Sequence, residues 1–207
     1  MTTLVIDRST DVQSAALVKD GAISASCILE GADARSGDWV TRIRDFLAAN
    51  GESVATLGRI VAGTGPGSFA GIRSALAFAQ GCAAGSGCEV MGLTSAAAYS
   101  KHEGPVAVIG DARRGLFWIA LFDGPQLAVP VFQVKQDELK LRVPLSADVV
   151  SPDTKRIGSI LSEEFEERFK DCGAPLAEGL ARAMLANEKL LVKEPLPIYL
   201  NPAVRQD

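Results

Sequence analysis

The segment GTGPGSFAGIRSALAFAQG at residues 63–81 decides the fold of this chain. It follows the apolar run RIVA at residues 59–62, and its second half places Ile72, Leu76 and Ala79 at helical spacing. The pattern predicts a strand, a tight glycine turn and a helix. Such a junction directs backbone N–H groups and the positive end of the helix dipole toward one point, which suits phosphate or carboxylate. The candidate anion or nucleotide loop comprises Gly65, Gly67, Ser68 and Arg73; the alternative is a turn without a ligand.

The composition is that of an ordinary globular protein without a basic face. Of the 207 residues, 47% are hydrophobic and 22% are charged, and the formal net charge is -4. This length allows one domain or two small lobes. Proteins that bind nucleic acid by themselves usually present clustered lysine and arginine, which are scattered here. A role on nucleic acid would therefore require a partner.

Neither a secretory signal nor a membrane span is expected. The N-terminus enters the strand-like run LVID at residues 4–7 without a basic region, and no window approaches the roughly 18 apolar residues of a span. The four cysteines form no CxxC pair and are expected to be reduced. His102 is the single histidine, which argues against a multi-histidine metal site. We expect a cytoplasmic protein without a metal.

The first hundred residues predict strands and helices in a simple order. Asp20-Gly21 predicts a hairpin turn between two early strands, and Trp39, Ile43 and Leu47 mark a helix that begins near Asp38. The expected elements are strands at 4–7, 14–18, 22–29, 60–62 and 89–93, and helices at 38–49, 70–86 and 95–100.

The polar break at residues 101–105 restarts this pattern. A strand at 106–109 ends in Gly110-Asp111, and two further strands follow it. We expect an N-terminal lobe over residues 1–103, a smaller C-terminal lobe over 104–189, and residues from about 190 to 207 packing back on the first lobe. Asp7 and Asp111 would then occupy equivalent strand ends.

A cleft between two such lobes would be lined by charged residues. The candidate cleft residues are Asp7, Asp111, Arg113 and Arg114, because a guanidinium suits phosphate or carboxylate. For Arg73, the alternative to a ligand contact is a structural ion pair with Asp7 or Asp111.

The last third is less regular. Residues 155–158 are interpreted as a strand, and Leu161, Phe165 and Phe169 as one face of a helix whose glutamates at 163–167 are solvated. Pro175 is placed at the start of a further helix, and the tail from Pro195 is expected to be extended.

Four ordered motifs resemble the TsaB/YeaZ family of bacterial tRNA threonylcarbamoyladenosine biosynthesis proteins. GPGSFAGIR at 65–73 is similar to the family's GPGSFTGLR, and LVID at 4–7, followed by Ser9-Thr10, is similar to its N-terminal strand. DARRG at 111–115 and PIYL at 197–200 resemble its DARRG and PxYLR motifs. The motifs span both ends of the chain in the expected order, whereas a glycine loop alone is weak evidence.

The resemblance implies a fold and a function. The fold is α/β, actin-like and sugar-kinase-like (ASKHA, ribonuclease H-like), with two lobes of mixed sheets flanked by helices. The function is a non-catalytic role in threonylcarbamoylation of adenosine 37 (t6A) in tRNAs that decode ANN codons, through binding and activation of the transferase TsaD. The resemblance also implies the ATPase TsaE in a larger complex, a homodimer without TsaD, tRNA contact only through the complex, and no cofactor other than ATP or ADP at a partner interface.

The resemblance places the partner interface on the helices at 38–49 and 70–86. The predicted interface residues are Trp39, Ile43, Phe69, Ile72, Leu76, Ala79 and Ala83. From the residues alone, burial of the second helix on both sides within its own lobe is an equal alternative, because small residues allow close helix packing. We expect Ala79→Arg to abolish partner binding while the fold stays intact.

The sequence departs from the family pattern at several positions. Ala70, Ser74, Ala75 and Gln80 replace the usual threonine, isoleucine, glycine and lysine; Arg35-Ser36 stands for a HS pair; and Asn201 replaces an arginine. Three alternatives remain: a small-molecule kinase or ATPase that uses Asp7, the glycine loop and Asp111; a peptidase that uses Ser68 with His102; and a homodimeric scaffold unrelated to tRNA.

Overall fold

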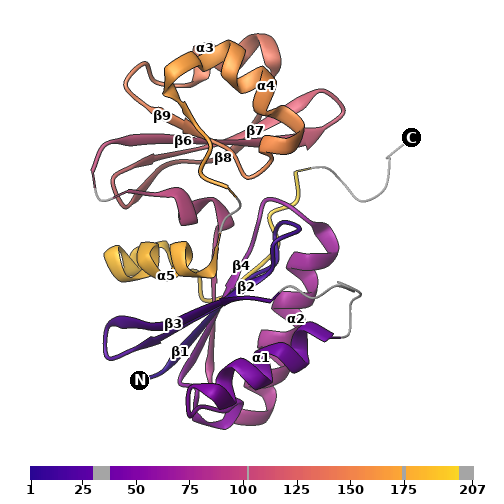
Figure 1. Cartoon of the computed structure of the whole chain (residues 1–207), viewed down its shortest axis with the longest axis vertical. Helices are drawn as coiled ribbons and strands as arrows, with labels where there is room; N and C mark the ends of the chain where they lie inside the picture. The colour runs from indigo at the N-terminus through magenta and orange to yellow at the C-terminus, as the bar shows by residue number, and fades with distance from the viewer. Residues whose placement is uncertain (30–37, 102, 174–175, 201–207) are drawn as a thin grey trace. The chain divides into compact units, whose positions relative to one another are not determined.

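The computed structural model describes residues 1–29, 38–101, 103–173 and 176–200 (Figure 1). Arg35, Ser36, His102, Pro175 and Asn201 lie outside the described residues. The strands are β1 (Thr3–Asp7), β2 (Ser14–Lys19), β3 (Ala22–Ile28), β4 (Arg59–Gly63), β5 (Glu89–Leu93), β6 (Pro105–Arg113), β7 (Leu116–Asp123), β8 (Gln126–Lys135), β9 (Asp148–Val150) and β10 (Phe169–Lys170). The α-helices are α1 (Asp38–Ala49), α2 (Phe69–Ser86), α3 (Leu139–Arg142), α4 (Thr154–Phe165) and α5 (Ala177–Ala186). The short 3-10 helices are η1 (Val54–Thr56), η2 (Ser95–Tyr99), η3 (Gln136–Glu138), η4 (Glu166–Arg168) and η5 (Glu188–Leu190).

The chain forms two compact units. The first holds Met1–Ala98 with Pro175–Pro197, and the second holds Tyr99–Ala174 with Ile198–Asp207. The five-stranded sheet of the first unit has the order β3-β2-β1-β4-β5, and that of the second has the order β10-β9-β6-β7-β8. In each sheet a central strand pairs antiparallel with the strand that follows it and parallel with a later one. The two sheets therefore share one topology.

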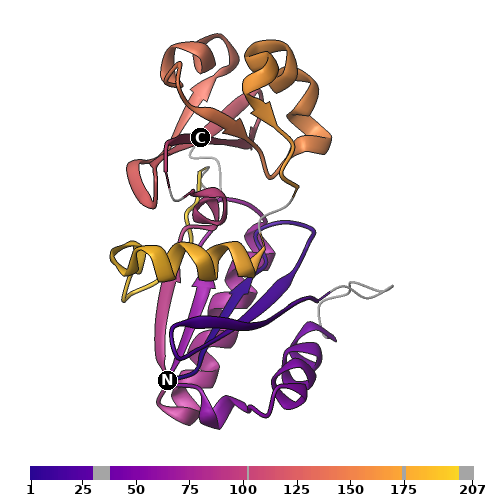
Figure 2. The same ribbon diagram turned by 60° about the vertical axis from the view of Figure 1, so that its left-hand side comes forward.

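The first unit is a sheet with helices on both faces. Leu4 and Ile6 pack with the apolar residues of α1 and α2 on one face, and α5 contacts β1, β2 and β3. Figures 1 and 2 show α5 on the face opposite α1 and α2. The side chains of β1 alternate between these faces, because successive residues of a strand point to opposite sides. Asp7 therefore shares its face with Val5, away from α2.

The placement of α5 differs from the expectation that residues 104–189 form one lobe. The backbone N–H of Ala177 donates to Ser14 Oγ of β2 at 2.8 Å. A Cβ on Gly179 would lie 2.6 Å from the carbonyl oxygen of Ala98, so only glycine permits this approach. The buried stripe that includes Leu180 and Met184 is covered by the first sheet. Helical periodicity predicted the stripe but did not reveal which sheet would cover it.

The segment after α5 runs along the edge of the first sheet. Gly92 and Val192 exchange two backbone hydrogen bonds, at 2.8 and 2.9 Å. Arg59 forms ion pairs at 2.8 Å with Glu89 and Glu188. These contacts fix the start of the tail on β5.

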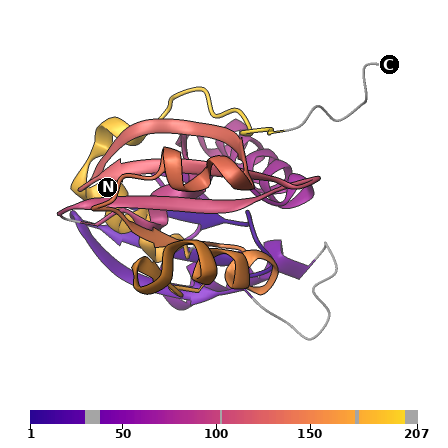
Figure 3. The ribbon, with the colours of Figure 1, turned by 90° about the horizontal axis from the view of Figure 1, so that it is seen from above.

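The second unit packs its helices on one face of its sheet. Leu139 and Val143 near α3, together with Ile157, Leu161 and Phe165 of α4, bury the inward side chains of β6, β7 and β9. Figure 3 shows α4 alongside these strands. No helix within the described residues is long and apolar enough to cross a membrane.

Three sequence expectations in this unit are wrong. Residues 155–158 belong to the first turn of α4 rather than to a strand, because Ile157 begins the buried stripe that Leu161 and Phe165 continue. Phe169 pairs with Val149 in β10 instead of extending that helix, which ends at Phe165. The strand after residue 105 continues past Asp111 to Arg113 through an irregularity in its register.

Candidate functional site

The glycine loop joins β4 to α2, and its shape depends on the chain that follows β1. A Cβ on Gly67 would lie 2.0 Å from the carbonyl oxygen of Ser9, and a Cβ on Gly71 would lie 2.0 Å from that of Arg8. The hydroxyl of Ser68 caps α2 by accepting a hydrogen bond from the Gly71 N–H at 3.2 Å. The glycines thus permit close backbone packing between the loop and residues 8–9.

Several loop N–H groups are engaged within the first unit. Gly65 N–H donates to Ser95 Oγ at 3.0 Å, and Ser68 N–H donates to the carbonyl oxygen of Ser9 at 2.6 Å. A backbone N–H that is bonded inside the protein does not contribute to an anion site without giving up that bond. The use of Gly65, Gly67 and Ser68 as an anion or nucleotide loop stays a prediction.

Asp7 is a fully buried carboxylate at the end of β1. Its Oδ1 accepts from the backbone N–H and the hydroxyl of Ser9 at 2.9 and 2.7 Å, and its Oδ2 accepts from Ser95 Oγ at 2.6 Å. A Cβ on Gly63 would lie 1.9 Å from Oδ2, so glycine is required beside it. Burial raises the pKa of Asp7, although the hydrogen bonds from Ser95 and Ser9 oppose the increase. The carboxylate connects β1, β4 and the segment after β5.

The raised pKa of Asp7 predicts a pH-dependent penalty. Because the folded state binds the proton more tightly, protonation of Asp7 contributes to the free energy of unfolding. This stabilisation is complete below the unfolded pKa near 3.8 and is lost as pH rises through the higher folded pKa. Asp7→Asn keeps a neutral side chain of the same shape at every pH. We expect the variant to gain stability relative to the wild type as pH rises from acid to neutral, measured by urea unfolding across that range.

Asp123→Asn, at the exposed end of β7, controls for removal of one negative charge. Parallel profiles of wild type and Asp7→Asn would contradict the prediction.

Asp111 of the second unit makes the same local turn as Asp7. Its Oδ1 accepts from the backbone N–H two residues later, that of Arg113, at 2.7 Å, as Asp7 Oδ1 accepts from Ser9. Its Oδ2 lies 3.3 Å from the Arg113 guanidinium and 3.9 Å from that of Arg156. Arg113 and Arg114 are exposed and hold left-handed backbone conformations, with φ of 69° and 56°. The cleft role of these residues stays a prediction.

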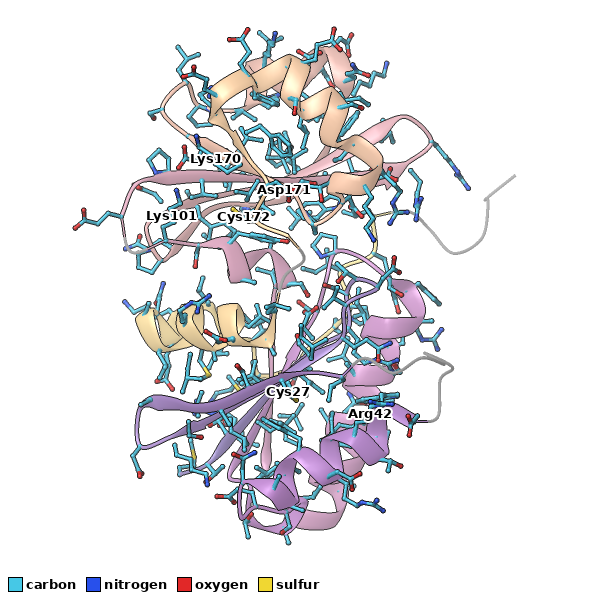
Figure 4. All side chains as sticks on the ribbon, in the orientation of Figure 1. Cys27, Arg42, Lys101, Lys170, Asp171 and Cys172 are labelled. Carbon is cyan, nitrogen blue, oxygen red and sulfur yellow. The ribbon has the colours of Figure 1, made fainter. Side chains whose placement is uncertain are left out.

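A second charged group in this unit surrounds Asp148 of β9. Lys101 forms an ion pair with Asp148, and this contact lowers the pKa of the carboxyl, with a smaller contribution from Lys170. Figure 4 labels both lysines and, nearby in the chain, the exposed Cys172. Among the described residues, no group of three or more His, Cys, Asp or Glu side chains is arranged to hold a metal. We interpret the lysine contacts as a structural connection to β9.

Comparisons with known proteins address the fold and the family. YeaZ from Pseudomonas aeruginosa superimposes with a TM-score of 0.77 at 23% identity, over 96% of this chain and 99% of that one. The (R)-2-hydroxyglutaryl-CoA dehydratase component A of Acidaminococcus fermentans superimposes with a TM-score of 0.50 at 14% identity, over 91% of this chain and 98% of that one. The predicted actin-like α/β fold with mixed sheets is confirmed.

Comparison of the amino-acid sequence gives a family model and a relative that are similar to this chain. Residues 38–124 match the family model described as TsaD, tRNA N6-adenosine threonylcarbamoyltransferase. The chain is 31% identical over 125 residues to the Escherichia coli (strain K12) tRNA threonylcarbamoyladenosine biosynthesis protein TsaB. The chain is therefore similar in sequence to TsaB over part of its length. The alignment covers 57% of this chain and 54% of the E. coli protein, so the chain spans about half the length of the curated relative it matches.

Most residues predicted for the partner interface face inward. Trp39, Ile43, Ile72, Leu76 and Ala79 are at most 6% exposed and belong to the core of the first unit. Ala83 is half-buried against that core, and Phe69 is 45% exposed. A partner cannot contact the buried group without displacing the sheet. Any interface on these helices therefore uses other side chains.

The outer face of α1 and α2 is exposed and combines small and apolar residues with charged ones such as Arg44 and Arg73. Val40 of α1 is 42% exposed, and Figure 4 labels Arg42 on the same helix, where it pairs with Asp38 at 2.9 Å. The exposed residues of α2 include Phe69, Ala70, Ala77, Gln80, Gly81 and Ala84. The α2 helix is thus buried on one side only, which differs from the alternative of burial on both sides. We call this surface the α1–α2 face.

Arg73 and Arg8 lie on the two sides of the first turns of α2. Arg73 is exposed, its guanidinium stacks over the Phe69 ring at 5.1 Å, and it forms no ion pair with Asp7, whose oxygens are occupied by Ser9 and Ser95. Arg8 is 7% exposed, and its guanidinium lies over the Trp39 ring at 4.2 Å. The sequence analysis missed Arg8, although a charged residue directly after a buried strand was a signal that could have found it.

Proposed function

We propose that this chain is a non-catalytic subunit for threonylcarbamoylation of adenosine 37 in tRNAs that decode ANN codons. It binds a TsaD-family transferase and activates it. The observation that carries the proposal is the 31% identity over 125 residues to a protein whose name places it in threonylcarbamoyladenosine biosynthesis. The match of residues 38–124 to the TsaD family model relates this chain to the transferase with which we pair it.

The α1–α2 face supports a binding role for this chain. Small exposed residues such as Ala77 and Gly81 allow another helix to approach closely, and exposed Val40 and Phe69 supply apolar area. We place the transferase on this face, with a homodimer there in its absence. The TsaE ATPase joins the larger complex in the cytoplasm, and tRNA is reached only through the complex, in keeping with the net charge of -4.

Reconstitution with the transferase of the same organism tests the proposal. We expect that neither protein alone forms threonylcarbamoyladenosine, and that this chain alone does not hydrolyse ATP. The two proteins together, with TsaE, tRNA and the threonylcarbamoyl donor, should form the product. The measurement is incorporation of labelled threonine into tRNA. Full activity of the transferase without this chain, or ATP turnover by this chain alone, would contradict the proposal and favour the kinase or ATPase alternative.

A further inference from the structure

Arg8 is a buried cation that has hydrogen-bond partners but no acidic partner among the described residues. Its Nε donates to Gln13 Oε1 at 2.9 Å, and its Nη1 donates to Ser74 Oγ at 2.5 Å. Both partners are neutral, and no carboxylate in the described part of the chain forms an ion pair with Arg8. Buried charges in proteins are usually paired. Burial lowers the pKa of this guanidinium, and no acidic group opposes that decrease.

The remaining nitrogen of Arg8 reaches solvent. Nη2 has no hydrogen-bond partner among the described residues. In that part of the chain, every fully buried side-chain nitrogen or oxygen does have a partner. Nη2 is therefore at the surface, while the rest of a side chain that is only 7% exposed is held between Trp39 and Ser74. The guanidinium is thus fixed in position, with two N–H donors available on its outer nitrogen.

Two sources of positive charge lie close to Arg8 along α2. The first turn of α2 contains no acidic residue, and the positive end of this 18-residue helix adds to the field. Arg73, one residue before Ser74, forms no ion pair among the described residues. Asp38 of α1 is already paired with Arg42 at 2.9 Å. Within residues 1–29, 38–101, 103–173 and 176–200, no carboxylate balances the charge on Arg8 through an ion pair.

We propose that the Nη2 group of Arg8 receives a carboxylate oxygen from an acidic side chain of the protein that docks on the α1–α2 face. This inference rests on the proposed function and names the chemistry that the partner must supply. A carboxylate is small enough to reach Nη2, although the Arg8 side chain is almost wholly buried. It replaces the water at Nη2 by a charge-assisted hydrogen bond. Exposed Phe69 and Val40 on the same two helices supply apolar area for the docking protein.

The first experiment asks whether Arg8 binds an oxyanion in the isolated protein. Thermal unfolding is measured in sodium phosphate and in sodium chloride at equal ionic strength, for the wild type, Arg8→Gln and Arg8→Lys. Phosphate stabilises proteins generally by exclusion from their surface, so the relevant quantity is the difference between variants. We expect phosphate to raise the Tm of the wild type more than that of Arg8→Gln. The matched control Arg142→Gln removes an exposed arginine of the second unit and should behave like the wild type.

The second experiment measures the Kd for the transferase partner with the same proteins. We expect Arg8→Gln to weaken binding about 30-fold or more, which corresponds to the loss of one partner of a desolvated charge pair, and Arg8→Lys to recover part of the loss. Arg142→Gln should bind like the wild type. Circular dichroism at the binding temperature confirms that each variant is folded.

The outcomes separate this inference from the proposed function. If the wild type binds no transferase, the proposed function is wrong, and so is the inference that a partner carboxylate binds Arg8. Normal binding by Arg8→Gln leaves the proposed function intact and overturns the inference. If phosphate distinguishes the variants but partner binding does not, the oxyanion comes from a soluble phosphate compound and the assignment to a partner carboxylate is wrong.

Discussion

Replacing Ala79 by arginine is expected to unfold the first unit rather than to block a partner. Ala79 is fully buried in the core between α2 and the sheet. An arginine there places an uncompensated charge in an apolar site and overfills the core, which together cost roughly 3–5 kcal/mol. This prediction replaces the expectation of an intact fold, because the helical stripe that includes Ala79 faces inward. Urea unfolding followed by Trp39 fluorescence, in a Trp118→Phe background, measures the change.

The neighbouring Ala77 provides the matched control. Ala77 is exposed on the same helix, so Ala77→Arg should change the free energy of unfolding by less than about 0.5 kcal/mol. The proposed α1–α2 face predicts that this variant, although folded, binds the transferase poorly. If Ala79→Arg unfolds at the same urea concentration as Ala77→Arg, the burial of this stripe is wrong.

Replacing Gly71 by alanine is expected to cost about 3 kcal/mol of stability, the second largest effect. The new Cβ would lie 2.0 Å from the carbonyl oxygen of Arg8, and a backbone atom cannot move away by changing a rotamer. The start of α2 must shift from the segment after β1, which also disturbs the contact between Arg8 and Ser74. Urea unfolding measures the loss, and the partner Kd should rise with it.

A second glycine of α2 should respond in the opposite direction. A Cβ on Gly81 meets no atom within 4 Å, and the residue is exposed in the helix. Gly81→Ala should stabilise the protein by up to about 1 kcal/mol, since alanine has the higher helix propensity. Loss of stability in Gly81→Ala, or none in Gly71→Ala, would contradict this account of the two glycines.

Local patterns predicted most elements of the first unit. The Asp20-Gly21 turn has φ of 50° and 77°, as its hairpin type requires, and Gly87 ends α2 in the left-handed conformation. The predictions failed where a short run fits two patterns. Residues 155–158 carry too few side chains to distinguish a strand from the first turn of a helix.

The sequence by itself determined most strands and helices of the first unit and the glycine turn of residues 63–81, because periodicity and left-handed positions are local properties of the chain. Only the tertiary structure decided what these residues face. Asp7 is enclosed by Ser95, which is 88 residues away, and Arg8 is held between Trp39 and Ser74. Ile72 and Leu76 are covered by the sheet, so the outer side of α2 is the exposed one. Burial depends on strands and helices brought together from distant parts of the chain, and no local pattern records that arrangement.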